Sequence, residues 1–148
     1  MTEISMEQKK RLAAPCGLDC FHCELYEANA PDSLIEHIAE KTGIPREEIP
    51  CKGCRETAGK HYHIPAGGCA TLNCVTKRGV SLCSECGDFP CALLAPLAEG
   101  ASFYPHNMKV YNLCRIKAVG LENWIRESGE IRRKYYTSPF VVGKGQEE

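Results

Sequence analysis

Hydrophobic and polar positions follow a helical period near both ends of the chain and lose it in the middle. Ser5-Met6-Glu7-Gln8 has the form of a capping box, which predicts a short helix that ends near Ala13, before Pro15. Apolar residues recur on one face between Asp32 and Lys41, and Gly43 suits the position just after a helix. The first third of the chain therefore predicts two short helices.

The last third carries the broadest apolar stripe, from His106 to about Val119, and Gly120 is expected to end that helix. The apolar residues that follow, as far as Ile125, predict a further short helix. Residues 137–148 show weak strand signals and then a polar tail that we expect to be frayed.

Between these ends, residues 51–91 contain eight glycines or prolines and seven cysteines, so a hydrophobic core is hard to build there. Leu72 to Arg78 predicts one short helix, closed by Gly79. Asp88-Phe89-Pro90 resembles the start of another, which is expected to run to about Ala98.

The fold class predicted from this pattern is mainly α: a small irregular metal-stapled domain of short helices joined by cysteine-rich loops and zinc knuckles. We expect a single cysteine-rich domain over residues 1–148. Within it, residues 15–91 form the metal framework, residues 102–135 the C-terminal helices and residues 141–148 a flexible tail.

Composition changes this picture through its eleven cysteines in 148 residues. No apolar signal segment and no run of the roughly 20 apolar residues that a membrane span needs is visible. We therefore expect a cytoplasmic protein with reduced thiols, and metal ligation in place of disulfides. The formal net charge of −1 gives no global attraction to nucleic acid or to a membrane.

Paired cysteines point most strongly to metal binding. Cys51-Lys52-Gly53-Cys54 and Cys83-Ser84-Glu85-Cys86 are both C-x2-C turns, and four thiolates from two such turns can complete a tetrahedral zinc site. Cys114 lies in the apolar helix and is predicted to be a core residue. The other ten cysteines are the predicted metal ligands: Cys16, Cys20, Cys23, Cys51, Cys54, Cys69, Cys74, Cys83, Cys86 and Cys91.

Ten thiols can fill two four-coordinate sites, so two zinc ions are expected. The pair geometry suggests that Cys51, Cys54, Cys83 and Cys86 share one site and that the second draws on the remaining six, although neighbouring turns could cross-pair. His22, His61 and His63 are the imidazoles nearest the cysteines, and the sequence does not decide whether they bind metal.

The order of these motifs resembles a family of small cysteine-rich prokaryotic proteins catalogued as domain of unknown function 3795. The motifs that carry the resemblance are CGLDCFHC, CKGCR, the C-x4-C of Cys69 and Cys74, KRGVSLCSECGDFPC and YNLCRIKAVGLENWI, which span Pro15 to Ile125. The resemblance implies a metal-binding protein, with zinc as the expected metal, and supplies no catalytic residue.

Several functions stay open at this point. The leading one is a zinc-binding protein with structural metal sites and an interaction or adaptor role towards an unknown protein partner. The first alternative is an iron–sulfur protein of the [4Fe–4S] type, in which Cys16, Cys20 and Cys23 hold three irons. The second is a nucleic-acid-binding zinc module that uses the basic C-terminal helices, which the slightly acidic chain favours less. The C-x3-C-x2-C spacing of Cys16, Cys20 and Cys23 is also that of radical enzymes that use S-adenosylmethionine. Such enzymes usually need a large βα barrel, which takes roughly 250 residues when complete, so the length of this chain disfavours that chemistry.

Overall fold

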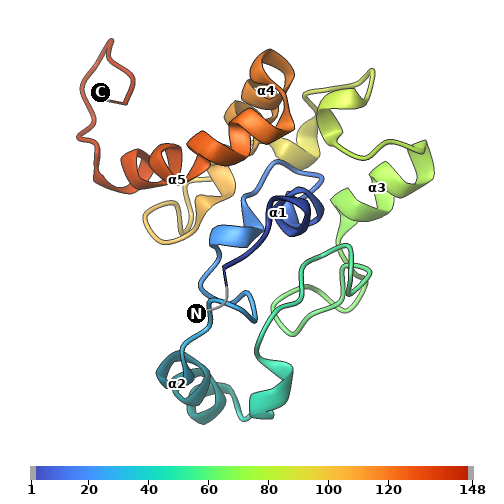
Figure 1. The fold of residues 1–148 in the computed structure, drawn as a ribbon, viewed down its shortest axis with the longest axis vertical. Helices are drawn as coiled ribbons and strands as arrows, with labels where there is room; N and C mark the ends of the chain where they lie inside the picture. The colour runs from blue at the N-terminus through green and yellow to red at the C-terminus, as the bar shows by residue number, and fades with distance from the viewer. Residues whose placement is uncertain (1–2, 147–148) are drawn as a thin grey trace.

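A computed structural model describes residues 3–146, and over this range the chain is helical with no named strand, which confirms a mainly α, small cysteine-rich domain (Figure 1). The α-helices are α1 (Met6–Leu12), α2 (Asp32–Thr42), α3 (Ala70–Arg78), α4 (Lys109–Val119) and α5 (Leu121–Thr137). Short 3-10 turns lie between them: η1 (Cys20–His22), η2 (Arg46–Glu48), η3 (Cys83–Glu85), η4 (Ala92–Leu94) and η5 (Pro105–Met108).

Local end signals place most helix boundaries. Ser5 Oγ accepts from the Gln8 N–H over 3.3 Å and the Gln8 side chain accepts from the Ser5 N–H over 2.9 Å, so the predicted capping box is present. Gly43 and Gly79 end α2 and α3 with φ of 72° and 67°, in the left-handed region that glycine adopts at low cost. Gly120 likewise separates α4 from α5.

Three expectations for local structure are wrong. The helix from Asp88 to Ala98 is only the turn η4, because Cys91 is fully extended (φ −123°, ψ 175°) and the Asp88 side chain pairs with Arg78 instead of capping a helix. The helix after Gly120 is not short but has 17 residues. Residues 138–146 form no strand, and the last two residues of the expected tail lie outside the described range.

The core lies where α4 and α5 pack on each other and α1 packs on α5 (Figure 1). Trp124 and Leu113 are completely buried, and Phe21 of η1 meets Trp124 edge-on at a centroid distance of 5.8 Å. Cys114 is exposed, which corrects its predicted core position. The buried face of α4 is set by Leu113 and Ile116, and Cys114 lies outside it.

Gly17 brings the first cysteine motif against this core. Its φ of +89° is in the left-handed region, and a Cβ there would lie 2.6 Å from the Lys109 carbonyl oxygen and 2.8 Å from Leu113 Cγ. The buried Asn112 side chain donates to the Gly17 carbonyl over 2.8 Å. The loop between Cys16 and Cys20 is thus seated directly on α4.

None of the helices in the described part of the chain is both long enough and apolar enough to span a membrane. The predicted division into a metal framework, C-terminal helices and a tail stays a prediction.

Candidate metal centre

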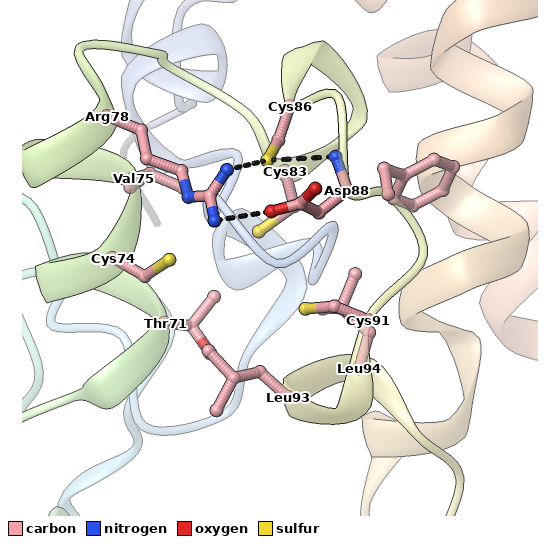
Figure 2. Close-up of a pocket in the computed structure, with 11 residues that line it drawn as sticks. Thr71, Cys74, Val75, Arg78, Cys83, Cys86, Asp88, Cys91, Leu93 and Leu94 are labelled. Carbon is pink, nitrogen blue, oxygen red and sulfur yellow. Dashed lines mark hydrogen bonds and ion pairs between the residues drawn. The ribbon is translucent and has the colours of Figure 1, made fainter.

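Four cysteines line one small cavity between α3, η3 and η4, which we call the Cys83 pocket: Cys74, Cys83, Cys86 and Cys91 (Figure 2). Cys74 comes from α3, Cys83 is the first residue of η3 and Cys86 follows that turn, and Cys91 precedes η4. The cavity has a volume of about 20 Å³. A cavity must offer roughly 10–15 Å³ to hold one water molecule, so this one accommodates a single atom-sized guest.

Burial and neighbouring thiolates keep the Cys83 thiol of the pocket protonated in the absence of a cation. The pKa of Cys83 is raised to about 11, first by burial and then by the negative charges of neighbouring thiolates, namely Cys16, Cys91, Cys74 and Cys86. A divalent cation would reverse this preference, because thiolates are the metal-binding form of cysteine. Cys91 is exposed while Cys83 is buried, so the pocket opens to solvent on the side of Cys91.

The other six predicted ligands do not line that pocket, and we call them the Cys20 cluster: Cys16, Cys20, Cys23, Cys51, Cys54 and Cys69. The pKa of Cys20 is raised well above its ordinary value, mainly by burial and then by the charges of Cys54, Cys16, Cys23 and Cys51. The pKa of Cys54 is raised to about 11, again by burial first, and then by Cys16, with Cys69 and Cys51 contributing. These thiols therefore lie within electrostatic reach of one another.

Backbone contacts bring together the chain segments that carry the cysteines of the Cys20 cluster. Cys51 pairs with the chain beside Cys23, since its N–H donates to the Leu25 carbonyl over 2.6 Å and its carbonyl accepts from Glu27 over 2.9 Å. The Gly59 N–H donates to the Cys54 carbonyl over 2.7 Å, and a Cβ on Gly59 would lie 3.0 Å from Cys69 Cβ. Cys51 and Cys54 are not among the residues that line the Cys83 pocket, and the predicted site of Cys51, Cys54, Cys83 and Cys86 stays a prediction.

Several of the cysteine turns aim a backbone N–H at sulfur. Gly53 donates to Cys51 Sγ over 3.3 Å, and Asp88 donates to Cys86 Sγ over 3.5 Å. Cys69 Sγ caps α3 by accepting from Leu72 over 3.5 Å. At Cys51 this contact lowers the pKa of the thiol and so opposes the effect of burial. Within residues 3–146, however, no three Cys, His, Asp or Glu side chains are arranged closely enough to hold an ion as they stand.

An ion pair that the sequence did not suggest holds the CGLDC loop on α5. Asp19 is only 1% exposed, and its Oδ1 accepts from Arg132 Nη1 over 2.7 Å. The pKa of Asp19 is raised by burial, which outweighs the opposing effect of Arg132. The two residues of this ion pair lie 113 positions apart, so no local sequence pattern could predict the pair.

The three histidines near the cysteines are engaged with protein groups. Ser128 uses its hydroxyl hydrogen on the Ile125 carbonyl, so His22 Nε2, 3.1 Å from Ser128 Oγ, must be the donor of that pair. Burial lowers the pKa of His22 and so favours the neutral ring. His61 Nε2 donates to the Ile49 carbonyl over 3.0 Å, and its Nδ1 faces Nδ1 of His63.

Fold and site together define a small, mainly α, cysteine-rich protein with two groups of thiols. The chain belongs to the family described as Protein of unknown function (DUF3795), whose sequence model matches residues 12–96. The match includes all ten predicted ligands and ends before the helical motif YNLCRIKAVGLENWI, which was expected to belong to the resemblance. No curated protein and no solved structure matches the chain.

Proposed function

We propose that the protein binds zinc through its cysteines and that the metal sites are structural. The observation that carries this proposal is the convergence of four thiols from three separate elements on one cavity of about 20 Å³ (Figure 2). Four thiolates are a complete ligand set for structural zinc, with no position left open for a substrate. Binding would draw the sulfurs inward by rotation of their side chains.

The four thiols that line the Cys83 pocket are the number that one structural zinc ion needs, so zinc is the metal that we propose there. The Cys20 cluster has six thiols, which is enough for the second zinc ion. An iron–sulfur cluster remains the alternative there, because thiolates suit both metals.

An interaction role is the second part of the proposal. Large apolar side chains are exposed near the C-terminal helices, among them Phe103 (80%) and Tyr104 (66%). Support for nucleic-acid binding is weaker, because the basic residues of the segment Arg132–Lys134 face acids: Arg132 pairs with Asp19, while Arg133 and Lys134 pair with Glu130.

Metal analysis tests the proposal directly. Protein purified without oxygen is expected to be colourless and to contain about two zinc ions per chain. A Cys83→Ser variant should lose the zinc of its pocket, whereas the matched control Cys114→Ser, on an exposed cysteine of α4, should keep both ions. A brown protein that contains iron and sulfide would overturn the zinc assignment, and a protein without bound metal would overturn metal binding altogether.

A further inference from the structure

Arg78 lies at the rim of the Cys83 pocket, in the last turn of α3 (Figure 2). Its Nη1 donates to Cys86 Sγ over 3.2 Å and its Nη2 donates to Asp88 Oδ2 over 2.5 Å. The pKa of Arg78 is raised, first by Asp88 and then by the charge of Cys86. One guanidinium therefore contacts a thiol of the pocket together with a carboxylate that fixes its orientation.

The remaining wall of the pocket offers little to balance negative charge. Four thiolates around one Zn²⁺ carry a net charge of about −2, and charge next to apolar groups needs a partner. Arginine suits this position because it stays protonated and presents several donors in a rigid fork. Most of the lining other than the thiols is apolar, with Val75, Phe89, Leu93 and Leu94.

We propose that Arg78 is a positioning residue of the metal centre: it holds Cys86 by an N–H···S hydrogen bond and offsets the negative charge of the thiolate set, while Asp88 orients its guanidinium. This inference rests on the proposed metal at the Cys83 pocket. With this role for Arg78, the four cysteine ligands differ in how well hydrogen bonds support their sulfur atoms. Cys86 also accepts from the Asp88 N–H over 3.5 Å and is therefore the best-supported sulfur, whereas Cys91 is exposed to solvent.

The hydrogen bond has two measurable consequences. Its loss should weaken metal binding, because partners of this kind typically change metal affinity about 10- to 100-fold. The hydrogen bond also withdraws electron density from Cys86 sulfur. Without it, the thiolate-to-cobalt charge-transfer band of the Co²⁺-loaded protein should move to longer wavelength.

The experiment compares full-length wild type, Arg78→Ala and Arg78→Lys, each loaded with Co²⁺ and titrated with a chelator. The matched control is Arg126→Ala, an exposed helical arginine that pairs with Glu122. We expect about a 10- to 100-fold weaker Co²⁺ affinity and a shifted band for Arg78→Ala. Arg78→Lys should be intermediate, because it keeps the charge and loses the fork. The control should match wild type in both measurements.

Each contrary result has a distinct meaning. If Arg78→Ala matches the control, the proposed role of Arg78 is wrong while metal binding stands. If affinity falls and the band does not move, Arg78 only supports the fold, which also overturns the proposal. If Arg78→Ala fails to fold, Arg78→Lys decides, and an unshifted band in that variant would refute the role. If wild type takes up no Co²⁺, the proposed function itself fails, and this inference fails with it.

Discussion

The helices α1, α4 and α5 differ from residues 51–91 in what holds them in place. The helices bury large side chains, with Trp124 and Leu113 completely inaccessible. The cysteine-rich segment buries few large apolar side chains, namely Leu72, Val75 and Leu82. Apolar burial therefore accounts for the order of the first region, while the second needs another source of order. The proposed metal ions supply it, because the free energy of metal binding becomes free energy of folding.

Metal removal is expected to show the largest difference between the helices and residues 51–91. A structural zinc site contributes on the order of 10 kcal/mol or more, so a chelator under reducing conditions should release the cysteine-rich segment and leave the helices folded. Hydrogen exchange read by mass spectrometry is expected to show lost protection over residues 51–91 and retained protection in α4 and α5. Equal loss in both regions would show that they form one cooperative unit.

Trp124→Ala tests whether apolar burial stabilises the helices α1, α4 and α5. Removal of this completely buried ring should lower the free energy of unfolding by about 3–5 kcal/mol, measured by urea denaturation. The matched control is Tyr111→Ala, because Tyr111 is an aromatic residue that is 56% exposed. If the tyrosine variant is as unstable as the tryptophan variant, the buried core is not where the structure places it.

Arg132→Ala tests the ion pair that holds the CGLDC loop on α5. The change leaves the buried carboxylate of Asp19 without its partner, and loss of one member of a buried pair costs about 3 kcal/mol. Because the cost comes from the stranded charge, the double variant with Asp19→Asn should regain part of the stability, as a double-mutant cycle would show. An additive double variant would mean that the two side chains do not interact.

Ser5→Ala gives the smallest expected effect. It removes the hydroxyl that accepts from the Gln8 N–H, and loss of such a cap typically costs about 1 kcal/mol. Thermal unfolding should show a small decrease in Tm, with metal content unchanged. An unchanged Tm would show that the Ser5 cap does not stabilise α1.

Features that depend on contacts within one helical turn could be predicted from the sequence, and contacts between distant segments could not. The capping box at Ser5 and the glycines that end α2, α3 and α4 act within one turn, and all were placed from the sequence. The cysteines were identified as one class of residue, but the choice of partners depends on how distant loops meet. The predicted site of Cys51, Cys54, Cys83 and Cys86 therefore stays a prediction, while the cavity beside Cys83 is lined by Cys74, Cys86 and Cys91.

Long-range contacts were also what made α5 longer than expected. Its polar composition gave only a short apolar pattern near Trp124, while the packing of Ile131 and the pairing of Arg132 with Asp19 continue to its last turns. Arg78 is a second residue whose long-range contact could not be predicted from the local sequence. Its helix was predicted, yet its contact with Cys86 depends on the path of the chain through η3.

The seat of the CGLDC loop on α4 and α5 has a consequence for biosynthesis. Gly17 and Asp19 find their partners Asn112 and Arg132 near the other end of the chain. Translation proceeds at roughly 5–20 residues per second, so a nascent chain carries all ten candidate thiols for several seconds before α5 exists to cover the loop. During that interval the CGLDC loop lacks the contacts with Asn112 and Arg132 that hold it in the finished fold.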